Sequence, residues 1–197
     1  EALLLARYSM FTQVYFHRTR RIYDQHLADF LAEWLEEGRF STALEDHLAM
    51  TDDRVLAAIQ DAAGARGSGK RRIRELARRI VDRDKRFSLL YGRELEDVKQ
   101  NADIAKVVAK AAQEQFGPEA IRFDIGGKSS SADVFPVRER GGQIVASSGT
   151  SEVLSKVPGS RYEYVFVEPS KRDDARTWLK EKKQTLLNTS WEDEVDG

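Results

Sequence analysis

The chain has 197 residues, 33% of them charged, with a formal net charge of −1. This length gives room for one mid-sized domain or two small ones. The near-neutral balance excludes a protein that binds nucleic acid through its overall charge, although it leaves room for a local basic patch. The absence of cysteine excludes disulfides, thiolate metal sites and cysteine nucleophiles, and it favours a cytoplasmic protein.

Neither a signal peptide nor an apolar run near the roughly 18 residues of a membrane span is visible, so we expect no membrane partner. The sequence begins at Glu1, without Met, directly in a helical pattern. We therefore expect it to be a fragment of a longer protein.

Residues 1–37 predict one long helix that ends at Gly38. One of its faces holds Leu4, Tyr8, Phe11, Tyr15 and Ile22, and the second holds Leu3, Met10, Val14 and His17. A helix that is apolar on two sides is expected to be buried on two sides. It would then carry cationic and phenolic groups into the protein, where an anion is the natural partner.

Three shorter helices follow, over residues 44–50, 53–63 and 70–84, the second of them capped by Thr51. The pattern then changes to short strands separated by Gly and Ser. We predict strands at 86–91, 120–125, 133–137, 143–145 and 161–168, helices at 97–116 and 169–187, and a short helix or turn at 151–156.

The predicted fold class is α+β, a mostly helical first part followed by a small mixed sheet with covering helices. The first domain spans residues 1–84, and the second spans residues 85–197 and includes an acidic tail.

Histidines are the first candidates for a metal site. His17 and His26 are nine residues apart, which places them on different faces of a helix, and His47 has Glu45 and Asp46 beside it. No established metal-binding motif includes any of them, so structural or solvated histidines are the favoured interpretation.

A second candidate is the run Gly126-Gly127-Lys128-Ser129-Ser130, which superficially resembles a phosphate-binding loop. It lacks the first glycine at the required spacing and a following helix. A flexible loop between strands is the favoured interpretation.

The third candidate is a basic segment, in which residues 66–86 carry ten Lys and Arg against three acidic residues. Lys70, Arg71 and Arg74 in it could bind a phosphate backbone or a polyphosphate. The alternative is a solvated helix face paired with acidic segments elsewhere, and both interpretations stay open. The segment lacks interleaved aromatic residues, so sequence-specific reading of single strands is not expected.

The fourth candidate is the first helix, where Arg7, Tyr15, His17, Arg18 and Arg20 could line a site for an anionic ligand. Arginine offers fork-shaped donors that match phosphate oxygens, and tyrosine can pack against a sugar. The alternative is a core helix whose long polar side chains reach solvent, and periodicity alone favours that alternative.

Three segments of the sequence resemble a known family. Residues 6–20 follow the pattern Ala-Arg-Tyr-x-Met-Phe-x-x-Val-Tyr-x-His-Arg-Thr-Arg, and the other two segments are residues 40–46 and 51–53. This pattern resembles the C-terminal half of HD-domain phosphohydrolases, in particular the deoxynucleoside triphosphate triphosphohydrolases. Residues 133–137, 161–167 and Pro169 resemble the HD-associated C-terminal region of the same family. The resemblance covers nearly the whole chain.

The resemblance implies roles for four residues. Tyr15 would stand against the sugar of a bound nucleotide, and Arg7 would lie close to its phosphates. His17 and Arg18 would lie near a nucleotide-binding subunit interface. The family forms dimers and tetramers, so the expected partners are nucleoside triphosphates and further copies of the chain, with nucleic acid not favoured.

The resemblance also implies a divalent metal, Mn, Mg, Fe or Zn, in the intact enzyme. The family's metal ligands, a histidine, a His-Asp doublet and a later aspartate, are absent from this sequence and are expected before Glu1. Relatives also carry histidine where this chain has Phe11. We therefore expect the chain to hold no metal and no catalytic residue, to be inactive alone, and to supply one wall of the pocket.

The leading prediction is thus the C-terminal portion of a metal-dependent HD phosphohydrolase that hydrolyses (deoxy)nucleoside triphosphates. The alternative is a non-enzymatic regulatory or oligomerisation module that binds nucleotide or nucleic-acid phosphates through residues 70–86. A steep fall of duplex affinity with added salt would favour nucleic-acid binding.

Overall fold

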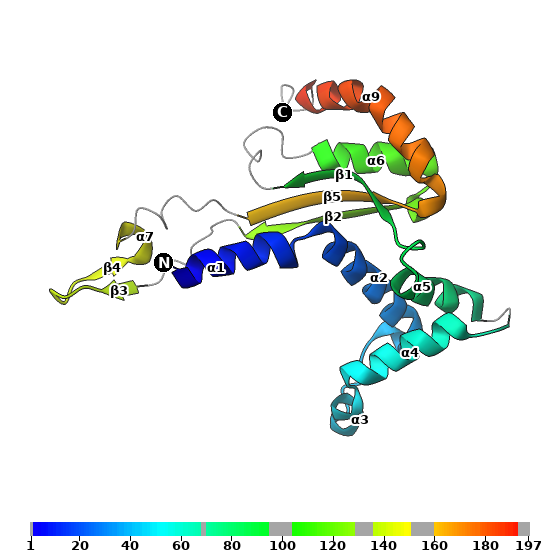
Figure 1. Cartoon of the computed structure of the whole chain (residues 1–197), viewed down its shortest axis with the longest axis horizontal. Helices are drawn as coiled ribbons and strands as arrows, with labels where there is room; N and C mark the ends of the chain where they lie inside the picture. Colours follow the sequence, from blue (N-terminus) through cyan, green and yellow to red (C-terminus); the bar gives the residue numbers. More distant parts are fainter. Residues whose placement is uncertain (1, 68–69, 95–103, 129–135, 151–159, 193–197) are drawn as a thin grey trace. The chain divides into compact units, whose positions relative to one another are not determined.

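The computed structural model of the chain describes residues 2–67, 70–94, 104–128, 136–150 and 160–192. Two compact units are present, one of residues 1–20, 89–167 and 171–197, the other of residues 21–88 and 168–170. The predicted α+β class is confirmed, with a mostly helical N-terminal part followed by a small antiparallel sheet (Figure 1).

The first unit is built on a three-stranded sheet with the order β1-β5-β2. Its strands are β1 (Ser88–Glu94), β2 (Ile121–Lys128) and β5 (Ser160–Val167). β2 and β5 are antiparallel, in a register that runs from Ile121 opposite Val167 to Lys128 opposite Ser160. β1 and β2 flank β5 and point the same way, so with the intervening α6 (Ile104–Phe116) they form a split β-α-β unit (Figure 1).

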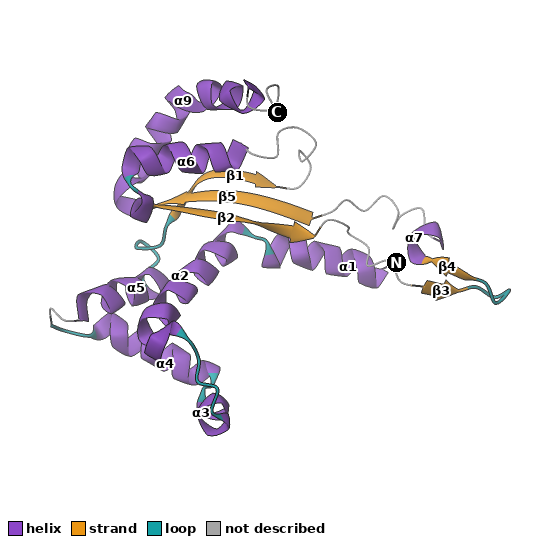
Figure 2. Ribbon diagram, turned by 180° about the vertical axis from the view of Figure 1, so that it is seen from behind, coloured by secondary structure: helices purple, strands orange, loops and turns teal. Residues whose placement is uncertain are grey.

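One face of this sheet is covered by α6 and by α9 (Arg172–Glu192) (Figure 2). Successive strand residues point to opposite faces, so Val165 and Val167 of β5 both point into the core beneath the helices. Small residues on α6 leave room for close packing on the strands. The buried core consists of Ile104, Ala105, Val108, Ala109, Ala112, Ile121, Val165, Val167, Ala175 and Leu179.

The other set of β5 side chains forms an aromatic row of Tyr162, Tyr164 and Phe166, all of them buried. The ring centroids of Tyr162 and Tyr164 are 5.2 Å apart, and those of Tyr164 and Phe166 are 5.8 Å apart. The ring of Phe16 packs on Tyr162 at 5.0 Å. β5 is therefore buried on both faces, as a central strand covered on both sides requires, and its one buried carboxylate, Glu163, pairs with Arg161 at 2.9 Å.

The N-terminal segment of the first unit is α1 (Ala2–Met10), followed by one π-helical turn, η1 (Phe11–Tyr15). Elsewhere, η4 (Pro118–Ala120) precedes β2, and a separate antiparallel pair is formed by β3 (Pro136–Arg138) and β4 (Ile144–Ala146). α7 (Ser147–Thr150) follows β4, and η5 (Pro169–Lys171) precedes α9.

The second unit is helical. Its elements are most of α2 (Arg18–Trp34), η2 (Glu36–Gly38), α3 (Leu44–Ala49), α4 (Asp52–Gly64) and α5 (Arg71–Val81). Its core is formed by Phe30, Ile59, Leu76 and Ala77. α4 begins as predicted at Thr51, whose hydroxyl oxygen accepts a hydrogen bond from the backbone N–H of Arg54 at 3.4 Å.

The prediction of one unbroken helix over residues 1–37 is wrong. Helical geometry is interrupted at Phe16 and His17, between η1 and α2. The physical reason is that the carbonyl of Phe16 accepts a hydrogen bond from the Tyr164 hydroxyl, at 3.0 Å, instead of from a following helical N–H. The sequence of this segment carries no Gly or Pro to mark the break.

The expected burial of this segment on two sides is also wrong, since no side chain of α1 or η1 is buried. Leu3 is 81% exposed and Met10 47% exposed. The reason is that the segment packs on one side only: its half-buried side chains, Leu4, Tyr8, Phe11 and Thr12, share one side of the helix, and its other side chains are exposed.

The predicted domain boundary near residue 84 stays a prediction. In the structure, residues 1–20 pack in the same compact unit as the sheet, and the helical unit consists of residues 21–88 with residues 168–170. Parts of the predicted helix 97–116 and strand 133–137, the turn 151–156 and the end of the acidic tail lie outside the described residues. Within the described part of the chain, no helix combines the length and apolar character that a membrane crossing needs.

Candidate functional site

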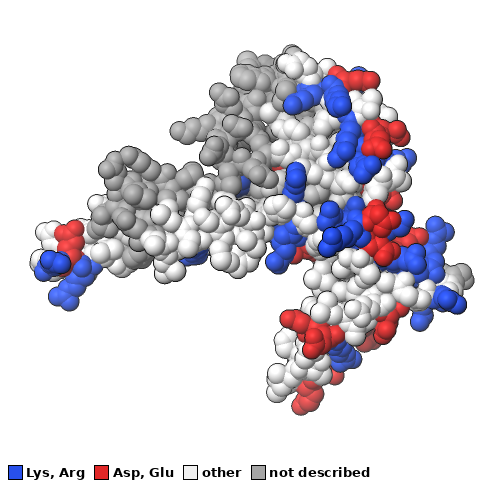
Figure 3. Space-filling view, in the orientation of Figure 1, with Lys and Arg blue, Asp and Glu red and all other residues white. Residues whose placement is uncertain are grey.

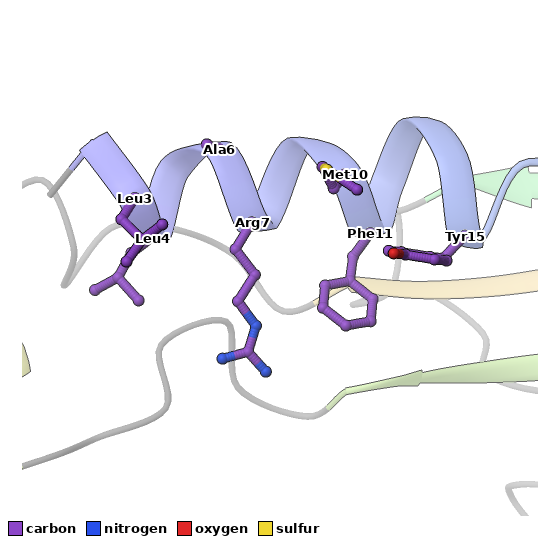
Figure 4. Close-up of a pocket in the computed structure, with 7 residues that line it drawn as sticks. All are labelled: Leu3, Leu4, Ala6, Arg7, Met10, Phe11 and Tyr15. Carbon is purple, nitrogen blue, oxygen red and sulfur yellow. The ribbon is translucent and has the colours of Figure 1, made fainter.

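The candidate site is a groove of about 630 Å³ along α1 and η1 (Figure 4). Its described lining consists of Leu3, Leu4, Ala6, Arg7, Met10, Phe11 and Tyr15. Most of these side chains are apolar, and the two that carry polar groups are Arg7 and Tyr15. The groove therefore combines an apolar wall with one permanent cation and one phenol.

The groove residues are aligned because Leu3, Arg7, Phe11 and Tyr15 follow one another at intervals of four. In an α-helix each such interval drifts by about 40° around the axis. A π-helical turn is wider than an α-helical turn, so η1 reduces the drift between Phe11 and Tyr15. The two rings pack with their centroids 5.2 Å apart.

Arg7 and Tyr15 approach the central ring of Phe11 from two sides along the segment (Figure 4). The guanidinium carbon of Arg7 lies 5.6 Å from the Phe11 ring centroid, within the range of a cation–π contact. Tyr15 is 41% exposed, which leaves its side chain accessible. The structure thus brings the two predicted substrate residues to one groove through a shared aromatic neighbour.

His17 and Arg18 lie in and just after the break that follows η1, and both are exposed. His17 Nδ1 accepts a hydrogen bond from the backbone N–H of Thr19 at 3.3 Å, in the first turn of α2. Neither residue belongs to the described lining of the groove. His17 therefore has a local structural contact at the start of α2.

Lys70, Arg71 and Arg74 lie at the start of α5, in the other unit from the groove. Arg71 Nε lies 2.9 Å from Glu75 Oε1, and Arg74 donates to the carbonyl of Ala65 at 3.1 Å. The Arg71 guanidinium lowers the pKa of Glu75, chiefly through this hydrogen bond.

Other basic side chains of this segment are also engaged within the unit. Arg72 pairs with Glu33 at 3.0 Å, and the guanidinium of Arg79 lies over the Phe87 ring at 4.9 Å. Lys and Arg are interspersed with Asp and Glu around α5 on the face shown in Figure 3. These contacts favour the structural interpretation of the basic segment over a surface reserved for phosphates.

The described residues do not fit a metal site, because no three His, Asp or Glu side chains converge within them. His26 is fully buried, and its Nε2 accepts a hydrogen bond from the backbone N–H of Phe87. His47 is exposed on α3.

The predicted loop at residues 126–130 differs from the structure in its first part. Gly126, Gly127 and Lys128 are the last residues of β2, paired with β5, while Ser129 and Ser130 lie outside the described residues. A Cβ at Gly126 would lie 2.5 Å from the hydroxyl oxygen of Tyr162. Close approach of this tyrosine explains the glycine without a phosphate ligand.

Three residues that support the groove segment were not anticipated as site residues, namely Phe16, Tyr162 and Tyr164. The alternating aromatics of the strand at 161–168 are visible in the sequence. The contact of Tyr164 with Phe16, however, joins residues that are 148 positions apart in the chain. No periodic pattern signals such a contact.

Residues 1–133 match a family model described as HD associated region. A hypothetical protein from Aquifex aeolicus has a similar structure, with 24% sequence identity and a TM-score of 0.73 over 90% of this chain and 43% of that one. A phosphohydrolase from Bacteroides thetaiotaomicron is 16% identical, with a TM-score of 0.48 over 82% of this chain and 48% of its own. No curated protein matches the chain.

The similarity to the Aquifex protein shows a shared fold. The chain spans less than half the length of both of these solved proteins. The family match covers well over half of the chain and includes the whole groove segment. The chain therefore belongs to the family of HD associated regions.

Proposed function

We propose that this chain is the C-terminal portion of an HD phosphohydrolase that hydrolyses (deoxy)nucleoside triphosphates, in which its groove forms one wall of the substrate pocket. The observation that carries the proposal is the arrangement of Arg7 and Tyr15 around Phe11 in a mostly apolar groove. Membership in the HD-associated family supports the reaction class.

The chemistry of the groove suits the parts of a nucleotide. The Arg7 guanidinium can donate paired hydrogen bonds to phosphate oxygens, because its planar fork of N–H donors matches their geometry. The ring of Tyr15 can pack against a sugar. Phe11 contacts both Arg7 and Tyr15, and so keeps these two side chains along the same groove. Arg7 and Tyr15 thus bind and orient the substrate, which places the reacting phosphate.

A divalent metal would supply activation of the attacking water in the intact enzyme. Its ligands are proposed to belong to a segment with a His-Asp doublet, which would precede this chain in the whole protein. His17 and Arg18 are proposed to lie at an interface between subunits, where the exposed guanidinium of Arg18 would meet a nucleotide phosphate.

The test measures triphosphate release, with Mn²⁺ or Mg²⁺, by a protein that joins this chain to an HD-motif segment. Arg7→Gln is expected to lower kcat/KM by about 10- to 100-fold, because a charged hydrogen bond contributes about 1.5–3 kcal/mol. Tyr15→Ala is expected to raise KM through lost packing.

Arg176→Gln is the matched control, since Arg176 is an exposed arginine on α9. It is expected to leave kcat/KM unchanged. Full activity in both groove variants would refute the pocket role, and release of phosphate or pyrophosphate in place of triphosphate would refute the proposed release of intact triphosphate.

A further inference from the structure

We propose that Tyr164 is a positioning residue, which holds the π-helical turn η1 and thereby sets where Phe11 and Tyr15 stand in the groove. The inference concerns the placement of groove residues, and only its consequence for nucleotide binding rests on the proposed function.

Tyr164 is itself held in place by the strand and by its neighbours. It lies in the middle of β5, paired on one side with β2, and only 2% of it is exposed. Its ring is held between those of Tyr162 and Phe166, with centroids 5.2 and 5.8 Å away. The Tyr164 hydroxyl is therefore presented from a rigid element.

This hydroxyl donates a hydrogen bond to the carbonyl oxygen of Phe16, at 3.0 Å. The N–H of Phe16 donates to the carbonyl of Phe11 at 2.9 Å, which closes the π turn. The Phe16 carbonyl lies at the end of that turn, where carbonyl groups lack partners within the helix. Tyr164 supplies a partner, and so fixes the residue at which the helix stops.

Phe16 has a second contact with β5, through its side chain. The ring of Phe16 packs on Tyr162 at 5.0 Å, on the face of the sheet that also presents Tyr164. Both the backbone and the side chain of Phe16 are thus held by β5. The end of η1 cannot rotate without losing both contacts.

Phe16 also contacts the groove residues. Its ring lies 5.5 Å from the ring of Phe11, and Phe11 in turn contacts Tyr15 at 5.2 Å and Arg7 at 5.6 Å. A regular α-helix from Arg7 to Tyr15 would drift by about 80°, whereas the wider π turn reduces this drift. The bond from Tyr164 therefore maintains the alignment that makes one groove wall.

The experiment compares Tyr164→Phe with the wild-type chain by amide hydrogen exchange, residue by residue. Loss of the hydroxyl is expected to speed exchange at the amides of Phe16 and His17 by about fivefold, the factor that corresponds to one net hydrogen bond. Unchanged exchange at both amides would overturn the proposal.

Two internal controls separate this effect from general destabilisation. Tyr162→Phe removes a hydroxyl from the same strand and face but keeps the ring that packs on Phe16, so exchange at Phe16 is expected to stay as in wild type. The amide of Val108, in the α6 core, reports on the fold of the unit. Faster exchange at Val108 in Tyr164→Phe, to the same degree as at Phe16, would also overturn the proposal.

The functional consequence is measured as binding of dATP to the protein that joins this chain to an HD-motif segment, in wild type and in the two variants. Tyr164→Phe is expected to raise the dissociation constant about fivefold, and Tyr162→Phe is expected to leave it unchanged. If the wild-type joined protein binds no dATP, the proposed pocket role fails, while the exchange at Phe16 still decides the positioning role.

Discussion

Nε2 of His26 accepts a hydrogen bond from the backbone N–H of Phe87, 3.3 Å away and 61 residues later in the chain. Both residues are buried, and their rings meet edge to face at 5.2 Å. The guanidinium of Arg79 lies over the ring of Phe87, 4.9 Å from its centroid. A single imidazole thus connects α2 to the residue that precedes β1, within the helical unit.

We expect His26→Leu to destabilise the chain by about 2–3 kcal/mol, because it leaves the buried N–H of Phe87 without its acceptor. His26→Gln retains a side-chain acceptor and is expected to cost less. Urea unfolding followed by circular dichroism measures both. Equal free energies of unfolding for the two variants would show that packing, and not the hydrogen bond, decides the stability.

Gly126→Ala is expected to destabilise the sheet unit by about 1–3 kcal/mol, the usual cost of overpacking. The added Cβ would lie 2.5 Å from the hydroxyl oxygen of Tyr162 and 2.8 Å from its ring carbon Cζ. Tyr162→Phe in the same chain removes the nearer atom and is expected to recover part of the loss. A double-mutant cycle in thermal unfolding measures this coupling, and strictly additive effects would contradict it.

Thr51→Ala is expected to cost about 1 kcal/mol, because the N-cap of α4 loses the side chain that accepts from the N–H of Arg54. Thr51→Ser retains a hydroxyl at this position and serves as the matched control. The free energy of unfolding of the helical unit checks the prediction. A serine variant as unstable as the alanine variant would exclude capping as the cause.

The ion pair of Arg71 and Glu75 predicts a small dependence of stability on pH. The hydrogen bond from Arg71 lowers the pKa of Glu75 below its usual 4.5 in the folded chain. A lowered folded pKa stabilises the fold above the unfolded pKa, and this stabilisation is lost as the pH falls from 4.5 through the folded value. Both side chains are more than half exposed, so salt screens the effect.

Glu75→Gln is therefore expected to lower the melting temperature slightly at pH 7 and not at pH 2.5. The difference at pH 7 is expected to shrink in 1 M salt. Scanning calorimetry at the two pH values checks both statements. A melting difference that persists at pH 2.5 would assign the effect to helix propensity instead of charge.

Much of the local structure follows from local chemistry. The Thr51 cap, the alternating aromatic and valine residues of β5, and the periodic apolar stripe of α5 each predicted an element that the structure confirms. These elements are determined by neighbours within a few residues, which is the range that periodicity and capping describe.

The placement of the groove residues could be predicted only in part. The interval of four residues from Arg7 through Phe11 to Tyr15 already put them on one side of a helix. The break after Tyr15 could not be foreseen, because the residues that cause it lie in β5, far along the chain.

The sequence by itself determined the α+β class, the capped and amphipathic helices, and the resemblance of the first segment to HD phosphohydrolases. Only the tertiary structure decided that the first helix stops at Phe16, that its other side stays uncovered by the described residues, and that its first twenty residues pack with the sheet. The physical reason is that a helix end needs a partner for its terminal carbonyl, and here that partner is a tyrosine 148 residues away.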